Sequence, residues 1–398
     1  MDYKISRKLS LLPPSGIRKI NEKALKLERE GKNIIHLEIG RPDFDTPEYI
    51  KKACIKSIEE GNVFYTSNFG TMELRKAIGE KLEKQNHIKY DPEEEILVSV
   101  GLSEAVYDVL SVLLEEGDEI LVPDPVWMNY LNLPKVLGAV PVTYQLLEEN
   151  EYQLDMEEIE RKITDKTKAM VIVSPNNPTG GVLQRQTLEQ LAKLAVKYDI
   201  MMISDEVYER IIFDGEEHIS IASMEGMKER TVTLNGFSKA YSMTGWRLGY
   251  VAAPAPVIAA VNKMHQHLTT CASSFVQAAG VAALREEKDE IGLLVEEYKR
   301  RRDYLVSQLN QIPGFHCLMP RGSFYVYVNV KAFPMSSAEL CEYFLMEGHV
   351  AMVPGSVFGE NGEGYIRLSF ANSYENIIEA VERLKRCVSE LKKAGKVK

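Results

Sequence analysis

The sequence is poor in cysteine, in tryptophan and in long apolar runs. Its 398 residues include five cysteines and two tryptophans. The scattered cysteines form no CxxC pair, which disfavours a disulfide framework and a zinc site and favours a reducing cytoplasm. The uncharged stretch 264–284 contains histidine, glutamine and hydroxyl side chains, and it is too polar to span a membrane. The first 16 residues lack the apolar core of a signal peptide. We therefore expect neither membrane insertion nor secretion.

The chain also lacks an excess of positive charge. It has 48 lysines and arginines against 58 aspartates and glutamates, a net charge of −10. Nucleic-acid binding needs a cationic surface, so nucleic acid is an unexpected partner. With 45% hydrophobic and 27% charged residues, the composition is that of a globular protein with two or three domain-sized units.

What the sequence does contain, from about residue 47 onward, is an alternation of helical segments with short apolar runs. The runs are apolar throughout, which is typical of strands buried on both faces of a parallel sheet. The predicted helices lie near 47–60, 71–86, 102–116, 127–137, 187–198 and 256–268, and the predicted strands at 95–100, 119–123, 169–175, 200–206, 231–237 and 248–253.

The pattern changes after about residue 285. A long charged helix, two strand-like runs (FYVYVNV and GYIRLSF) and a closing helix indicate a smaller α+β unit. We expect the N-terminal segment, a helix over 15–30 followed by a short strand, to pack with this part, which would make the second domain discontinuous. The run Arg300–Arg302 is predicted to lie on the solvent-facing side of its helix.

Polar residues directly follow several of the predicted strands, and ligands gather at the carboxyl ends of parallel strands. A helix start near Ser103 favours an anion such as phosphate, although a serine there can also be a simple cap. A carboxylate at the end of a buried strand, Asp205, needs a cationic partner. Lys239 could be a surface residue, or a cleft lysine with a depressed pKa that acts as a nucleophile.

Taken together and in order, these segments resemble the class I/II aminotransferases, pyridoxal 5′-phosphate (PLP) enzymes of fold type I. The resemblance implies a large PLP-binding α/β domain, 45–285, whose mainly parallel seven-stranded sheet is covered by helices. It also implies a small α+β domain made of 1–44 and 286–398. The matching motifs are LEIGRPDF (37–44), YTSNFG (65–70), SPNNPTG (174–180), SDEVYE (204–209), NGFSKAYSMTGWRLGY (235–250) and GYIRLSF (364–370).

The resemblance implies catalytic roles for Lys239, Asp205 and Tyr208. Lys239 would form the internal aldimine with PLP and move the proton between the substrate Cα and the cofactor. Asp205 would keep the pyridine nitrogen protonated, and Tyr208 and Asn177 would hydrogen-bond the phenolic oxygen. The other implied cofactor contacts are Trp127 on the ring face and, around the phosphate, Leu102, Ser103, Ser238, Arg247 and, from the neighbouring subunit, Tyr65. No metal is implied.

Substrate binding is implied for Arg367, which would hold the α-carboxylate with Asn177, Trp127 and the Gly40 backbone nearby. The role of Tyr65 implies a homodimer with active sites at the subunit interface. One departure is Gly236, because several family members carry serine or threonine there as a phosphate ligand. Ser238 is the expected replacement.

The implied reaction is ping-pong transfer of the α-amino group of an L-amino acid to a 2-oxo acid. The sequence does not distinguish between aspartate, aromatic amino acids and other neutral amino acids as the amino donor, and 2-oxoglutarate is the expected acceptor. Alternatives are a β-elimination lyase or aminocyclopropane-carboxylate synthase of the same fold, and a non-catalytic PLP-domain regulator. A nicotinamide dehydrogenase would need a GxGxxG motif, which is absent. His265 and His267 are expected to be structural, because no third metal ligand accompanies them.

Overall fold

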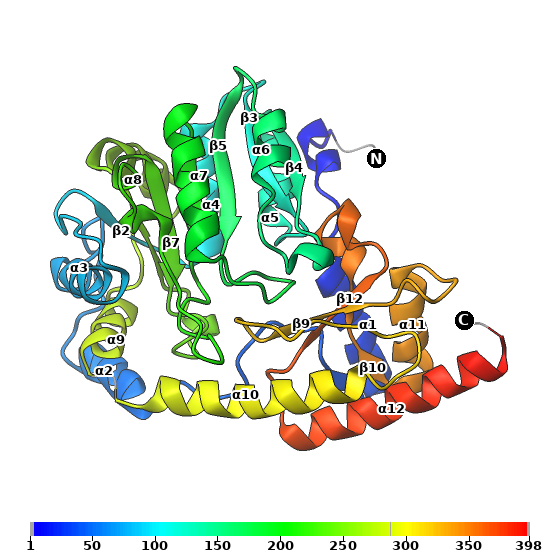
Figure 1. Cartoon of the computed structure of the whole chain (residues 1–398). Coiled ribbons are helices and arrows are strands. Elements are labelled where there is room, and N and C mark those ends of the chain that lie inside the picture. The colour runs from blue at the N-terminus through cyan, green and yellow to red at the C-terminus, as the bar shows by residue number, and fades with distance from the viewer. Residues whose placement is uncertain (1–3, 287, 396–398) are drawn as a thin grey trace.

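The computed structural model describes residues 4–286 and 288–395, and its centre is a seven-stranded sheet (Figure 1). The strand order is β2-β8-β7-β6-β5-β3-β4, and β8 runs antiparallel to both of its neighbours while the pairs from β7 to β4 are parallel. The predicted mainly parallel sheet is confirmed. The strands are β2 (Ile96–Ser99), β3 (Glu119–Asp124), β4 (Val140–Gln145), β5 (Thr167–Val173), β6 (Met201–Asp205), β7 (Thr231–Gly236) and β8 (Gly249–Ala252).

Both faces of this sheet are covered by helices, which explains why its strands are apolar throughout. In β3, Ile120 and Val122 belong to a core shared with α4 (Leu102–Leu113), α5 (Asn129–Leu137) and α8 (Ala255–Leu268). Leu121 between them points into the opposite core, which contains α6 (Met156–Lys162) and α7 (Arg185–Lys197). Successive strand residues thus serve opposite faces, as the pleat requires.

A third group of helices covers the β2–β8 edge of the sheet. It consists of α2 (Glu48–Glu59), α3 (Met72–Asn86) and α9 (Ser274–Arg285), and α9 contacts both α2 and α3. Their apolar side chains share a core with Ile96, Val98 and Tyr250 of the edge strands. The alanine-rich helix α9 was not among the predicted helices.

The N-terminal segment joins the C-terminal part of the chain. Strand β1 (Ile35–His36) pairs in parallel with β10 (Val350–Ala351), and a three-stranded antiparallel sheet lies beside them. That sheet comprises β11 (Val353–Pro354), β12 (Tyr365–Ser369) and β9 (Tyr325–Asn329). The remaining helices are α1 (Gly16–Arg29), α10 (Glu290–Leu309), α11 (Ser337–Gly348) and α12 (Tyr374–Lys393).

Helix α10 extends along the molecule beneath the seven-stranded and the three-stranded sheets in the view of Figure 1. This position makes the prediction for Arg301 and Arg302 wrong, because the inner face of α10 is covered: their exposed fractions are 6% and 1%. Arg302 pairs with Asp214, and Arg301 binds both carboxylate oxygens of Asp43 at 2.9 and 2.8 Å. Burial is tolerated because each guanidinium has a counter-ion.

Short 3₁₀ helices complete the structure at Arg7–Leu11, Glu148–Asn150, Ile221–Ser223, Lys228–Arg230, Thr244–Trp246, Gly355–Phe358 and Glu360–Gly362. Across the described ranges, every helix is too short or too polar to cross a membrane.

Candidate active site

A cavity of about 700 Å³ lies where β5, β6 and β7 end, bordered by the start of α4 and by β9 and β12. All but one of the sequence-predicted site residues line it. The exception is Tyr65, which is 87% exposed in the loop between α2 and α3. The predicted residues that the cavity brings together are Gly40, Leu102, Ser103, Trp127, Asn177, Asp205, Tyr208, Ser238, Lys239, Arg247 and Arg367.

Lys239 follows β7 and extends its amine into this cavity. The Nζ atom donates a hydrogen bond to the carbonyl oxygen of Gly40 at 2.6 Å and lies 5.5 Å from the ring centres of Tyr208 and Phe324. In the described part of the chain, no carboxylate forms an ion pair with it. Burial, followed by the charge of Arg367, lowers its pKa to about 8. About a tenth of this amine is therefore neutral and nucleophilic at pH 7, far more than for an ordinary lysine.

Asp205 is the last residue of β6 and is buried. Its Oδ2 accepts a hydrogen bond from the Tyr130 hydroxyl at 2.8 Å, and its Oδ1 accepts from the backbone N–H of Val207 at 3.2 Å. Neither partner is charged, and burial raises the pKa of the Asp205 carboxyl to about 6. Within residues 4–286 and 288–395 no basic side chain pairs with it, so the carboxylate is set up to receive a cationic group from a ligand.

Tyr130 was missed as a functional residue. The sequence gives little indication of its role, because a tyrosine in a helix such as α5 is most simply interpreted as part of the apolar core. Tyr325 was missed for the same reason: it lies in the apolar strand β9, yet its hydroxyl is 2.8 Å from that of Tyr208. Both tyrosines set the hydrogen bonding of predicted site residues.

The start of α4 and Arg247 form a concentration of positive charge. Gly101, with φ of +75°, is the residue that precedes the helix, so no N-cap side chain accepts a hydrogen bond from its first backbone N–H groups. Arg247 lies so close that a Cβ on Gly101 would be 2.4 Å from its Nη2 atom. Its Nη1 donates to the Thr244 carbonyl at 2.9 Å, and the described residues provide it with no carboxylate. A helix N-terminus beside a guanidinium favours a bound anion.

Gly236 departs from the family pattern for a steric reason. A Cβ there would be 2.7 Å from Leu102 and 3.0 Å from the Cα atom of Gly249. A serine or threonine at 236 would require the backbone of β8 to move. Ser238, by contrast, lines the cavity.

Arg367 of β12 forms a second anion-binding position. It is 1% exposed, donates to Asn177 Oδ1 at 3.0 Å and to the Glu38 carbonyl at 2.6 Å, and lies 4.3 Å from the ring centre of Tyr325. Its Nε is buried without a hydrogen-bond partner in the described structure. Burial lowers the pKa of this guanidinium. A buried cation with a free donor calls for a carboxylate.

The geometry thus places a nucleophilic amine and a buried carboxylate between two anion-binding positions. Arg18 and Arg41 also line the cavity. A ligand with a phosphate at one end, a basic ring nitrogen and a carbonyl carbon would satisfy Arg247, Asp205 and Lys239 at once. Arg367 would remain for a second, carboxylate-bearing molecule.

Comparisons with known proteins agree with this geometry. The family model described as aminotransferase class I and II matches residues 32–384. The aspartate aminotransferase of Pyrococcus abyssi is 44% identical over 390 residues, covering 98% of this chain and 99% of that protein. The aromatic-amino-acid aminotransferase 2 of Thermococcus litoralis is 41% identical, with coverage of 98% and 99%. The structure of the aspartate aminotransferase from Thermus thermophilus with maleate superposes with a TM-score of 0.93 at 37% identity, covering 97% of this chain and 100% of that one.

Proposed function

The chain belongs to the class I and II aminotransferases, and from that membership we propose that the cavity residues described above hold its cofactor and substrates. The protein is a PLP-dependent aminotransferase that acts on an amino acid and a 2-oxo acid. The unpaired buried carboxylate of Asp205 carries the residue assignment, because it lacks the cation that a protonated pyridine nitrogen supplies.

The other residues around the cavity fit the same cofactor. The Lys239 amine would bind its aldehyde carbon, and Asn177 and Tyr208 would hydrogen-bond its phenolic oxygen. Trp127 would cover the ring, and the phosphate would take Arg247, Ser238, Ser103 and the N–H groups of Leu102 and Ser103. When bound, PLP supplies an aldehyde that takes up the amino group and a protonated ring that stabilises negative charge at the substrate Cα.

Substrate orientation falls to Arg367. Its guanidinium would bind the α-carboxylate, with Asn177 held against it by the 3.0 Å hydrogen bond. This clamp fixes the Cα–H bond relative to the ring plane, which selects removal of a proton over loss of CO₂. Lys239 Nζ would then take that proton from the substrate Cα and deliver it to the carbon that was the cofactor's aldehyde carbon, because its pKa of about 8 suits transfer near neutral pH.

We propose dicarboxylates and aromatic amino acids as the substrate classes, with 2-oxoglutarate as acceptor. Arg18 and Arg41 line the cavity and supply the second cation that a side-chain carboxylate needs, whereas Ile17, Trp127 and Tyr325 supply apolar surface for an aromatic ring. Similarity to enzymes named for aspartate and for aromatic amino acids supports both classes.

A single-turnover screen tests this function. The yellow holoenzyme is mixed with aspartate, glutamate, phenylalanine, tyrosine or alanine, and loss of the absorbance of the lysine-bound cofactor is recorded. Amino acids that convert it to the pyridoxamine form are donors, and 2-oxoglutarate should restore the yellow form. If no donor converts it, while a β-substituted amino acid yields pyruvate and ammonia, the enzyme is a lyase. The substitution Arg18→Met or Arg41→Met should slow the reaction with aspartate more than the reaction with phenylalanine.

We further propose a homodimer in which Tyr65 reaches the phosphate of the partner's site. Val63, Phe64 and Tyr65 are exposed, and so are Ile55 and Ile58 of the preceding helix α2, which is apolar surface suited to a second subunit. Mixed refolding of a Lys239→Ala chain with a Tyr65→Ala chain tests this. Recovered activity in the mixture supports sharing between subunits, and its absence contradicts it.

We propose two further assignments, one for the division into domains and one for the cellular compartment. One apolar core formed only by residues between 69 and 261, and another formed only by 20–34 with 345–351, support a division into a large unit, 45–285, and a discontinuous small unit, 1–44 with 286–398. The five cysteines are all unpaired thiols, which favours a reducing cytoplasm.

A further inference from the structure

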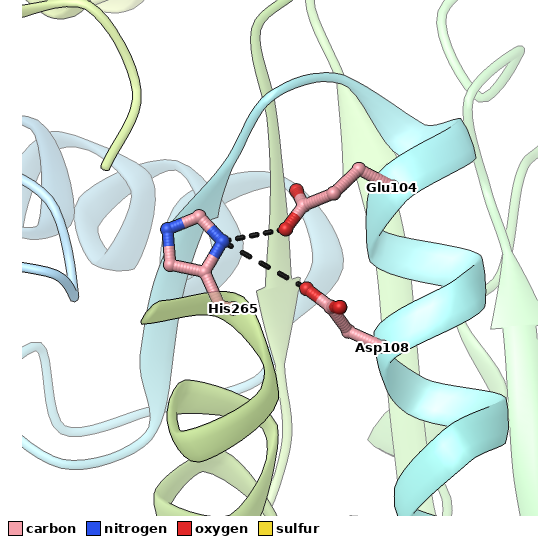
Figure 2. Close-up of side chains that lie close together, drawn as sticks. All are labelled: Glu104, Asp108 and His265. Carbon is pink, nitrogen blue, oxygen red and sulfur yellow. Dashed lines mark hydrogen bonds and ion pairs between the residues drawn. The ribbon is translucent and has the colours of Figure 1, made fainter. Parts of the chain in front are cut away.

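A buried cluster of three titratable side chains lies outside the cavity, between α4 and α8 (Figure 2). His265 Nδ1 is 2.5 Å from Glu104 Oε1 and 3.7 Å from Asp108 Oδ2. The Thr269 hydroxyl lies 3.1 Å from the same nitrogen and 3.4 Å from Glu104 Oε1. Two helices and the segment after α8 therefore converge on one point.

The cluster is short of positive charge. Asp108 and His265 are both 0% exposed. Neither oxygen of Asp108 has a hydrogen-bond partner among the described residues, and Nε2 of His265 also lacks one. No lysine or arginine of the described chain pairs with Glu104 or Asp108, so even an imidazolium would leave one negative charge uncompensated. Buried carboxylates in this condition take up either a proton or a further cation.

We propose that Glu104, Asp108 and His265 bind a divalent metal ion, for which Zn²⁺ is the best match. A divalent ion on a neutral imidazole balances both carboxylates. The donor atoms lie within 4.8 Å of one another, and zinc bonds of about 2.0–2.2 Å to nitrogen and oxygen place tetrahedral ligands about 3.3 Å apart. To reach this spacing, the Glu104–His265 pair, 2.5 Å apart, must separate by about 0.8 Å, and the Asp108–His265 pair, 3.7 Å apart, must approach by about 0.4 Å. The Thr269 hydroxyl or a water completes the set.

The position of the site gives it a structural consequence. Glu104 follows Ser103 in the first turn of α4, and its second oxygen accepts a hydrogen bond from the Val100 backbone at 2.9 Å. An ion bound here fixes the turn that borders the cavity against α8. Glu104 and Thr269 are partly exposed, which provides a route of entry.

A second group, Glu206, Glu209 and His218, has a similar arrangement and serves as a comparison. Its carboxylates are already satisfied: Glu206 accepts from Ser204 at 2.8 Å and Ser220 at 2.6 Å, and Glu209 pairs with Lys81. We expect no metal there.

The experiment uses the purified holoenzyme after dialysis against EDTA, with Zn²⁺ as the probe. Titration calorimetry should show one Zn²⁺ per chain, and thermal unfolding should show a higher midpoint with Zn²⁺. Asp108→Asn should weaken binding by at least about tenfold. His265→Gln is the second ligand variant, should Asp108→Asn fail to fold. His218→Gln and Cys271→Ser are the controls, and both should keep the wild-type affinity.

Asp108→Asn also has a readout that distinguishes a metal ion from a proton. Without metal, removing an uncompensated buried carboxylate should leave the thermal midpoint equal to or above that of the wild type. With Zn²⁺, the wild type should become the more stable protein. Four results would overturn the proposal. Zn²⁺ binding could fail to saturate, could survive in the ligand variants, or could be lost in either control variant. The order of the thermal midpoints could also stay the same when Zn²⁺ is added.

Discussion

Asp205 and Glu209 lie four residues apart in the chain, and both are buried, but their surroundings differ. Glu209 pairs with Lys81 and accepts from Asn86 at 2.8 Å and Asn235 at 2.7 Å. These partners hold its pKa at about 2 despite burial. Asp205 has only the Tyr130 hydroxyl and a backbone N–H, and its pKa rises to about 6. Charges satisfied by the protein stabilise the fold, whereas charges left unsatisfied mark where a ligand completes the site.

Removing the unpaired amine should have the largest effect of all. Lys239→Ala should lower the transamination rate by at least about 10⁴-fold, because the proposed covalent link and the proposed proton carrier are both lost. The free energy of unfolding of the cofactor-free protein should be unchanged or higher, because a buried cation without a counter-ion is removed. Steady-state kinetics and urea unfolding measure the two quantities.

A chemical control accompanies this variant. Borohydride reduction of the wild-type holoenzyme followed by peptide mapping should place the cofactor on Lys239. Label on another lysine would contradict the assignment.

Removing the paired amine, that of Lys81, should lower the stability of the fold, whereas removing Lys239 should not. Lys81→Met leaves Glu209 buried without its cation and should cost about 3–5 kcal/mol of unfolding free energy. Adding Glu209→Gln should recover part of this loss, because the charge is removed while an acceptor remains for the two asparagines. Lys76→Met, at an exposed position of the same helix, should change stability by no more than about 0.5 kcal/mol. An equal loss in Lys76→Met would show that the ion pair is not the cause.

Replacing the substrate-side guanidinium should have an intermediate effect. Arg367→Lys keeps the charge but cannot form a two-pronged contact with a carboxylate, so kcat/KM for amino donors should fall by about 10²-fold. The affinity for the cofactor should be unchanged, because the proposed phosphate position is formed by Arg247 and Ser238 and not by Arg367. Parallel losses in cofactor affinity and kcat/KM would contradict the division into two anion-binding positions.

Much of this arrangement could be predicted from the sequence because strand ends carry it. Continuous apolar runs predict strands buried on both faces, and the polar residues that follow them, such as Asp205 and Lys239, meet at one edge. Elements without a strong period were missed: β4 is a partly buried edge strand that contains Pro141, and α9 is apolar without a clear stripe.

Contacts between distant segments could not be predicted in the same way. The Tyr130 hydroxyl reaches Asp205 across 75 positions, and Lys81 reaches Glu209 across 128. No spacing rule links such pairs, because tertiary packing alone brings them together. The burial of Arg302 was misread for the same reason: a run of charges on a helix is typical of a solvent-facing side unless another segment covers it.

His36 lies between the two extremes and gives the smallest predicted effect. Its ring contacts Glu38 at 2.8 Å and Glu28 at 3.2 Å. The hydrogen bond to Glu38 raises the pKa of His36 to about 8 from 6.5. The folded state therefore holds this proton more tightly than the unfolded state, so the stabilisation is complete below about pH 6.5 and is lost as the pH rises through 8. A shift of this size corresponds to at most about 2 kcal/mol.

Urea unfolding of the holoenzyme at pH 6 and pH 9 should show this loss of stability in the wild type and not in His36→Gln. His87→Asn, at an exposed histidine with a left-handed backbone that asparagine tolerates, should retain it. An equal pH dependence in His36→Gln would show that another titrating group, and not this ion pair, causes it.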